Sequence, residues 1–323
     1  MKRTALALLV VSSALWGLST QAAPAKVPAS KDQLYIEVSA LGNLDYFYDH
    51  KMGMEMVGKE LGVRTEYVGP AEYDMNAMVA ALEQSIAKKP QGLVVVGFEP
   101  SLNSVVDKAV SQGIPVVTVD ADLPGSKRMA FVGTGNFNAG VVGGTKLAAL
   151  VGGKGKVAIM LKPGQSNLEE RVAGYKSALS KFKDIQIVQL VDTQSDPVVA
   201  AQAAAALLQK YPDLAGIACV EAAGGSGAAT AVREAKKVGQ VKIIAMDRGN
   251  EVLDGIKEGV ISASVAQQTA LMPYYAVEIL YNLANSKVAI TSDNKTAGVL
   301  GVPAVVDTGA IIIDSSNYKY FKR

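Results

Sequence analysis

The sequence of 323 residues has few of the side chains that most often build metal and catalytic centres. It contains one cysteine, Cys219, and one histidine, His50. A lone cysteine has no partner for an internal disulfide, and zinc-type sites need a cluster of histidine and cysteine ligands. We therefore expect no disulfide, no metal and no cofactor. Cys219 lies in an apolar run typical of a buried strand, and we expect it to act as a small buried hydrophobe.

An excess of positive charge is also missing. The chain has 32 lysines and arginines against 30 acidic residues, a net charge of +2. The longest basic runs are pairs, such as Lys88-Lys89 and Lys236-Lys237. Nucleic-acid-binding proteins concentrate basic residues on one face, so we expect no nucleic-acid partner.

The N-terminus has the order of charge, apolar run and small residues that is typical of a secretory signal. Lys2-Arg3 precedes the apolar residues 5–15, and small residues follow up to residue 25. The apolar run is too short for a membrane span, and no later segment offers ~18 uninterrupted apolar residues. We predict a signal peptide over residues 1–25 and an exported, soluble, monomeric chain of roughly 300 residues, enough for two lobes.

The rest of the sequence alternates strand and helix patterns in two successive series, which indicates βαβ units and parallel sheets. The predicted strands are 34–39, 64–69, 92–97, 116–119, 129–132, 156–161, 185–191, 214–220, 241–246 and 260–268. The predicted helices are 46–61, 75–87, 101–112, 138–151, 168–182, 198–210, 228–237 and 251–258. Residues 284–302 have the composition of a surface connection. The fold class predicted is α/β, with two doubly wound, Rossmann-like parallel-sheet lobes.

Polar residues follow many of these strands directly, at the edge where parallel α/β sheets bind ligands. They are Asp120, Asp122, Gln165, Asp192, Gln194, Glu221, Asp247, Arg248, Gln267 and Gln268. A single residue of this kind is typical of a turn or a helix N-cap. Six strand ends with such residues, spread over two lobes, predict a binding site between the lobes.

These side chains suit a ligand rich in hydroxyl groups. Carboxylates accept hydrogen bonds from hydroxyls, and a guanidinium donates through a rigid fork. The apolar faces of sugars pack against aromatic rings, which Tyr46, Phe47 and Tyr48 supply after the first strand. Because three consecutive residues cannot all face the core from one helix, at least one of these rings is expected to meet solvent or ligand.

Five segments together resemble the periplasmic sugar-binding proteins of the ribose/galactose-binding type, the solute receptors of ABC importers. The segments are the aromatic cluster after the first strand, "VTVDADLPGSKRMAFVGTGNFNAG", "EERVAGYKSAL", "IIAMDRG" and "SASVAQQ". The resemblance implies the type I periplasmic binding protein fold, whose two lobes are joined by a three-segment hinge. It implies an N-terminal lobe of 26–134 plus 268–306 and a C-terminal lobe of 135–267 plus 307–323.

The resemblance also implies ligand-binding residues. The stacking aromatics match Tyr46 and Phe47, the aspartate ending the fourth strand matches Asp120, and the arginine early in the second lobe matches Arg171. The further candidates are Asp247, Gln267, Glu221, Asn43 and Asn136. Asp122 is expected to be a turn or supporting residue.

Three positions depart from the ribose-type pattern. Leu44 and Glu221 stand where asparagines are expected, and Ser195 stands where the second lobe would carry an aromatic. Asp120, Glu221 and Asp247 outnumber Arg171, so the resemblance implies either a proton held in the site or a ligand with an amine. The segment "GKELGVRTEYVGP" is also similar to the branch that binds the furanosyl autoinducer.

The function expected is capture of a small sugar or polyol between closing lobes in the periplasm, for delivery to an ABC-transporter permease and possible presentation to a chemoreceptor. The alternative is a sensory receptor for the autoinducer or for an amino-sugar or cyclitol signal. An exported enzyme is less favoured, and we expect no catalytic residues, because "GTGNFNAG" and "AAGGSGAA" lack the phosphate-binding spacing and "GGSGA" lacks the final glycine of a nucleophile elbow. A transcription regulator of the same fold would need a DNA-binding segment where the signal peptide is predicted.

Overall fold

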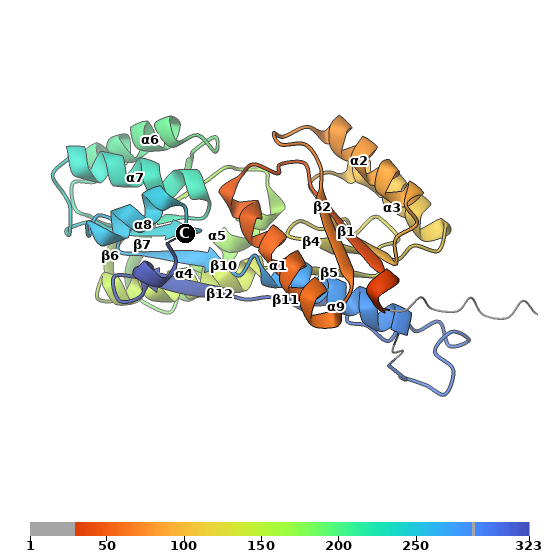
Figure 1. Ribbon diagram of the computed structural model, residues 1–323. Coiled ribbons are helices and arrows are strands. Elements are labelled where there is room, and N and C mark those ends of the chain that lie inside the picture. Colours follow the sequence, from red (N-terminus) through yellow and green to blue (C-terminus); the bar gives the residue numbers. More distant parts are fainter. Residues whose placement is uncertain (1–29, 286–287, 323) are drawn as a thin grey trace, which may run out of the picture.

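The computed structural model describes residues 30–285 and 288–322. They form two α/β lobes, each built on a six-stranded sheet (Figure 1). The predicted signal peptide, residues 1–25, lies outside the described residues. In the described part of the chain, no helix is both long and apolar enough to cross a membrane.

The first lobe has an all-parallel sheet in the order β11-β5-β4-β3-β1-β2. Its strands are β1 (Leu34–Val38), β2 (Arg64–Val68), β3 (Gly92–Val96), β4 (Val116–Val119), β5 (Ala130–Gly133) and β11 (Val305–Asp307). Its helices are α1 (Asp45–Leu61), α2 (Met75–Ala87), α3 (Asn103–Ser111) and α9 (Leu271–Asn285), with the short 3-10 helices η1 (Ser30–Asp32) and η2 (Pro100–Leu102).

The second lobe has a sheet in the order β12-β10-β9-β8-β6-β7, in which only β12 is antiparallel to its neighbour. Its strands are β6 (Lys154–Leu161), β7 (Asp184–Asp192), β8 (Leu214–Cys219), β9 (Lys242–Met246), β10 (Ala263–Gln267) and β12 (Ala310–Asp314). Its helices are α4 (Asn136–Leu150), α5 (Ser166–Leu179), α6 (Pro197–Lys210), α7 (Ala222–Glu234) and α8 (Asn250–Lys257), with the 3-10 helix η3 (Tyr318–Tyr320). The predicted fold class, two doubly wound α/β lobes with parallel sheets, is confirmed.

Local chemistry explains several of these elements. The β-branched runs of β3 and β4 are buried along their whole length, as expected for central strands of a parallel sheet. Asp74 begins α2 by accepting the backbone N–H of Ala77. Asp196 caps α6 in the same way, directly before Pro197. Gly62 ends α1 in the left-handed conformation.

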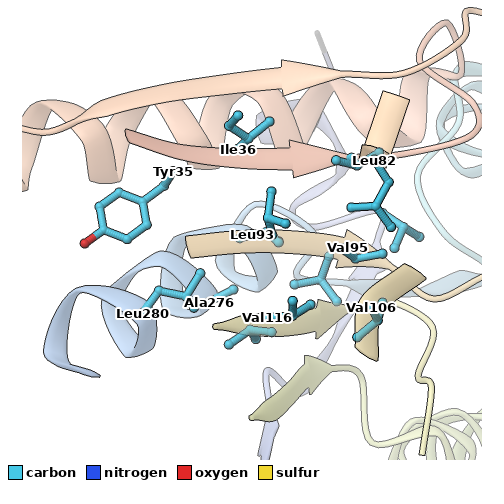
Figure 2. Packing of buried hydrophobic residues seen from close by; sticks show 14 of the residues in the cluster. Tyr35, Ile36, Leu82, Leu93, Val95, Val106, Val116, Ala276 and Leu280 are labelled. Atoms are coloured by element: carbon cyan, nitrogen blue, oxygen red, sulfur yellow. The ribbon is translucent and has the colours of Figure 1, made fainter. Parts of the chain in front are cut away.

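The core of the first lobe joins segments that lie far apart in the sequence. Ala276 and Leu280 of α9 pack beside Leu93 and Val116 of the central strands (Figure 2). In the second lobe, alternate residues of β8 face opposite sides of the sheet, so Ile217 and Cys219 belong to one cluster while Ala218 and Val220 belong to another. Cys219 is fully buried, as predicted. Helices therefore cover the faces of each sheet. The carboxyl ends of its parallel strands are the place where such a sheet binds a ligand.

The chain passes between the sheets three times: from β5 to α4, from β10 to α9, and from β11 to β12. The crossings are tied together. Thr308 donates its N–H to the carbonyl of Gly133, and Gln268 donates to the carbonyl of Thr308 at 2.5 Å. Asp307, which still pairs with Gly133 in the first sheet, accepts the N–H of Gly135 at 2.6 Å. The lobe boundaries expected from the sequence stay a prediction.

Two helices differ most from expectation. No helix was predicted between the last strand and residue 284, where the structure has α9. α7 begins at Ala222, six positions before the expected residue 228. A Gly-Gly-Ser-Gly stretch is a poor helix former, but close packing requires it here: a Cβ on Gly227 would lie 2.5 Å from the Cβ of Ala200 in α6. Tertiary packing therefore overrides local propensity at the start of α7.

Candidate functional site

Each lobe places one aspartate in the same unusual backbone conformation at the end of its fourth strand. Asp120 follows β4 with φ 64°, and Asp247 follows β9 with φ 65°. The backbone N–H of Asp120 bonds to the carbonyl of Val132 at 3.1 Å, and that of Asp247 bonds to Val265 at 2.8 Å. Aspartate tolerates left-handed φ better than most residues, at a cost of about 1–2 kcal/mol. The two carboxylates are thus held at equivalent places in the two lobes.

Tyr46 connects the first turn of α1 to the aspartate of its own lobe. Its hydroxyl donates to Oδ1 of Asp120 at 2.6 Å. Burial raises the pKa of Tyr46 well above 10, and the carboxylates of Asp120 and Asp247 raise it further. The hydroxyl therefore stays protonated and orients one oxygen of Asp120.

The three consecutive aromatics of α1 point in different directions. Phe47 is 2% exposed and packs edge-on against Tyr46 and Phe98 in the first-lobe core. Tyr48 is 58% exposed. The expected division between core and surface is confirmed, and Phe47 supports the ring of Tyr46 from below.

Arg171 carries the buried positive charge of the second lobe. Its Nε donates to Oδ1 of Asn136 at 2.9 Å, and its Nη1 donates to the carbonyl of Val220 at 3.0 Å. These bonds use two of the five guanidinium donors. Asn136 and Val220 thus hold the guanidinium in position while its remaining donors stay available for other acceptors.

The position of Arg171 depends on unusually close contact between α4 and α5. A Cβ on Gly140 of α4 would lie 2.0 Å from the carbonyl oxygen of Arg171, and one on Gly174 of α5 would lie 2.1 Å from the carbonyl of Phe137. No side chain fits at either place. The glycines let the two backbones approach, and this sets how far Arg171 reaches.

Asp247 is a carboxylate whose pKa is raised by its surroundings. Burial raises its pKa, and Asp120 adds to this effect, whereas Arg171 and a 3.1 Å hydrogen bond from Nε2 of Gln267 oppose it. Burial is the largest effect, so the charged form is costly in the unliganded protein. A ligand that donates hydrogen bonds to this carboxylate would offset that cost.

Glu221 is largely buried, and both its oxygens are engaged by the lobe itself. Thr193 donates its hydroxyl to Oε1, and Ser195 donates to Oε2 at 2.5 Å. Ser195 and its neighbour Gln194 both adopt positive φ, so the turn after β7 is held in a strained form that presents these hydroxyls. The carboxylate of Glu221 is therefore satisfied without a cation from outside.

A cavity of about 440 Å³ lies between the lobes. It is lined by Asn43, Leu44, Tyr46, Asp49, Ala222, Asp247, Arg248, Gly249, Asn250, Gln267, Thr269 and Phe321. Four of the nine residues expected from the sequence, Asn43, Tyr46, Asp247 and Gln267, line it directly. Asp120 adjoins it through Tyr46. Asn136, Arg171 and Glu221 do not line it, and Phe47 lies in the core.

The sequence reasoning missed several residues of this wall. Asp49 lies one helical turn after Tyr46, and Gly249 and Asn250 directly follow the strand-end pair Asp247-Arg248, so spacing was a usable signal for these three. Phe321 is different: nothing near it in the chain marks it as part of a site.

An ion pair joins the lobes at the rim of the cavity. Nη2 of Arg248, from the second lobe, donates to Oδ2 of Asp49 in α1 of the first lobe. Thr269, just after the crossing at β10, donates to the same oxygen at 2.6 Å. The side chain of Asp49 is 3% exposed and that of Arg248 is 25% exposed, so a partly buried contact bridges the two lobes directly.

Below Tyr46 lies a fully buried pair, His50 and Glu37, with Nδ1 and Oε1 2.5 Å apart. Burial alone would lower the pKa of His50, but Glu37 outweighs it and Asp120 and Asp49 add to the rise, so the pKa lies above 6.5. The imidazole therefore has a structural and electrostatic place beneath the cavity. His50 does not line the cavity. Asp122 does not line it either, and its carboxylate is held by Arg128 and Thr118.

No group of three or more histidine, cysteine, aspartate or glutamate side chains among the described residues is arranged to hold a metal ion. The cavity instead combines carboxylates, a guanidinium, amides and aromatic rings from two lobes joined by three segments. This arrangement defines a class of protein: a two-lobed receptor that closes on a small solute.

The comparisons with known proteins identify the family. The model described as "Periplasmic binding protein domain" matches residues 38–287, and the chain belongs to this family. A D-allose-binding periplasmic protein of Escherichia coli is 28% identical over 262 residues, covering 77% of this chain and 83% of the relative. A ribose import binding protein of Bacillus subtilis is 26% identical over 78% of this chain and 81% of its own.

Solved structures agree. An arabinose-binding protein from Geobacillus stearothermophilus has a TM-score of 0.85 at 36% identity, covering 90% of this chain and all of that one. A solute-binding protein of an ABC transporter from Burkholderia graminis, in complex with D-arabinose, has a TM-score of 0.75 at 28% identity, covering 92% and 100%. The resemblance to periplasmic sugar-binding proteins of ABC importers, found in the sequence, is confirmed.

Proposed function

We propose that this protein binds a neutral monosaccharide or polyol between its lobes and delivers it to the permease of an ABC importer in the periplasm. The observation that carries the proposal is the set of acceptors and donors at one cavity. Tyr46 lines the cavity from the first lobe and is bonded to Asp120, and Asp247 and Gln267 line it from the second lobe, where the charge of Arg171 acts on Asp247. Such a set grips the hydroxyls of a sugar ring from both sides.

A neutral ligand is favoured over an amine. The hydroxyls of Thr193 and Ser195 already occupy both oxygens of Glu221, so this carboxylate has donors within its own lobe. Burial raises the pKa of Asp247, which favours its uncharged form, and the ion pair of Arg248 with Asp49 adds no net charge. Relatives named for allose, ribose and apiose are in keeping with an uncharged ligand.

Binding would favour the closed arrangement of the lobes, because only then do both sets of side chains reach one ligand. Closure expels water, so each hydrogen bond acts in a medium of lower dielectric constant. The closed form would be the one that the permease recognises. A chemoreceptor would be a second partner that recognises this form. No step in this cycle requires catalysis.

The test is a thermal-shift screen of residues 26–323, followed by calorimetry. The panel contains D-ribose, D-allose, D-apiose, D- and L-arabinose, D-tagatose and xylitol, with glucosamine, myo-inositol and the furanosyl autoinducer as contrasting compounds. A ligand at ~100 times its dissociation constant adds roughly 2.7 kcal/mol of stability. We expect a neutral sugar or polyol to raise the melting temperature and to be recovered unchanged. A response confined to glucosamine, or to the autoinducer, would contradict the proposal.

A further inference from the structure

The C-terminal segment Tyr318–Lys322 brings an aromatic ring to the cavity from the far end of the chain. Phe321 lines the interlobe cavity together with Leu44 and Tyr46 of the first lobe. It also lines a smaller neighbouring cavity of about 180 Å³, beside Gln268 and Thr269. In Figure 1 the C-terminal end lies on the second lobe, on the side that faces α1.

Hydrogen bonds and apolar packing anchor this segment to the second lobe. Asn317 donates its side-chain amide to the carbonyl of Ile312 at 3.0 Å and accepts the N–H of Asp314 at 2.9 Å, which turns the chain after β12. Lys322 donates to Asp254 of α8 at 2.7 Å. Between these two anchors Phe321 packs against the core cluster of the second lobe. Its ring therefore moves with the second lobe when the lobes close.

The chemistry of the cavity wall leaves a place for such a ring. The other residues that line the cavity from the second lobe are small or polar: Ala222, Asp247, Arg248, Gly249, Asn250 and Gln267. They can bind hydroxyls but offer little apolar surface. A sugar ring also has faces of C–H groups, which lose contact with water favourably against an aromatic side chain. Tyr46 supplies one ring from the first lobe, and Phe321 is the aromatic that faces the cavity from the second.

We propose that Phe321 is a ligand-contacting residue whose ring packs on an apolar face of the bound sugar, so that the C-terminal segment is part of the binding site. The inference rests on the proposed function. It predicts that an aromatic ring at position 321 senses the ligand directly, whereas the adjacent position 320 does not. Tyr320 belongs to the same segment, is 75% exposed and does not line the cavity, so it is a matched control.

The first experiment uses the absence of tryptophan from residues 26–323, since Trp16 is the only one in the sequence. Phe321→Trp and Tyr320→Trp each introduce a single indole. The probe is the panel compound that the unsubstituted protein binds most tightly by calorimetry. We expect the indole emission of Phe321→Trp to change as this compound is added. The dissociation constant fitted to that change should equal the one that calorimetry gives for the same variant. The emission of Tyr320→Trp should not change. Equal responses, or none from position 321, would overturn the inference.

The second experiment separates ligand contact from a purely structural role. We expect Phe321→Ala to weaken binding about tenfold or more, which corresponds to the energy of one aromatic packing contact. Tyr320→Ala should leave the affinity within about a factor of two of that of the unsubstituted protein. Phe321→Leu keeps much of the apolar packing on the second lobe, so it should restore the unfolding stability but not the full affinity. If Phe321→Ala loses stability yet keeps full affinity, the ring is structural and the inference fails. If the unsubstituted protein binds no panel compound, the proposed function fails, which calorimetry shows before any variant is made.

Discussion

The two lobes wind their first five strands in the same order and differ at the sixth. In the first lobe β11 is parallel to β5, whereas in the second β12 is antiparallel to β10. Only Thr308 and Gly309 separate β11 from β12, so the chain runs almost straight from one sheet into the other. The parallel strands of both sheets end at the cavity. A chain that leaves the first sheet as a parallel strand therefore enters the second sheet from the cavity side, opposite in direction to the strands there. The antiparallel strand thus follows from two ligand-binding edges that face each other.

The lobes also position their candidate site residues by different contacts. In the first lobe, Tyr46 at the start of α1 donates to Asp120 after β4, 74 positions away. In the second lobe, Arg171 lies at the glycine contact between α4 and α5, and Asp247 accepts from Gln267, 20 positions away. Both lobes need glycine at a helix contact, because a Cβ on Gly53 of α1 would lie 2.2 Å from the carbonyl oxygen of Ala270.

The largest effect is expected from neutralising the two strand-end aspartates. Asp120→Asn and Asp247→Asn should each weaken sugar binding about 30- to 100-fold, because each removes a charged acceptor of ligand hydroxyls. Asparagine keeps the left-handed backbone accessible.

The two variants should also differ in stability. Burial raises the pKa of Asp247, so its charge is costly at neutral pH, and Asp247→Asn should melt higher than the unsubstituted protein without ligand. Calorimetry and thermal melts measure both quantities. Asp213→Asn, on the surface, is the control, and full affinity in both variants would remove the aspartates from the site.

The helix contact beside Arg171 is tested at Gly140. We expect Gly140→Ala to lower the free energy of unfolding by about 2 kcal/mol, the usual cost of forcing extra volume into a tight contact. It should also weaken binding, because the added methyl group presses on the backbone of Arg171. Urea unfolding and calorimetry measure these effects. Thr145→Ala, an exposed site on the same helix, serves as the control, and wild-type affinity in Gly140→Ala would show that this contact does not position Arg171.

A pH titration tests the buried pair beneath the first half of the site. Since the folded state raises the pKa of His50 above 6.5, its stabilisation is complete below about pH 6.5 and is lost as the pH rises through the folded-state pKa. The free energy of unfolding should fall over this range by at most about 1.4 kcal/mol per pH unit from this proton. The double variant Glu37→Gln/His50→Gln should lack this part of the slope. Identical slopes would mean that His50 does not titrate as a buried pair.

The smallest effect is expected from the ion pair that joins the lobes. The double variant Asp49→Asn/Arg248→Met removes both charges, so no charge is left buried alone. We expect affinity to fall by no more than about fivefold, in line with the modest net worth of most ion pairs. Calorimetry against the double variant Arg233→Met/Glu258→Gln, a surface pair within the second lobe, measures the difference. A loss as large as that from Asp247→Asn would mean that the pair contacts ligand.

Much of the fold could be predicted because βαβ units have short-range patterns. The limits of α2 and β4 agree with the sequence prediction residue for residue. Asp120 and Asp247 could be singled out because strand ends are visible in the chain. The start of α7 could not, because glycine is a poor helix former and the close contact of this segment with α6 is visible only in the folded chain. The orientation of Phe47 toward the core likewise depends on how α1 is rotated over its sheet.

The sequence by itself determined the two series of strands and helices, the polar residues at the strand ends and the family to which the chain belongs, because these features depend on neighbours a few positions apart. Only the tertiary structure decided which distant residues share the cavity. Asp49 and Arg248 are 199 positions apart and form one ion pair, and Phe321 reaches the wall beside Tyr46 from the other end of the chain. Such meetings depend on the packing of whole lobes, which no local pattern of residues records.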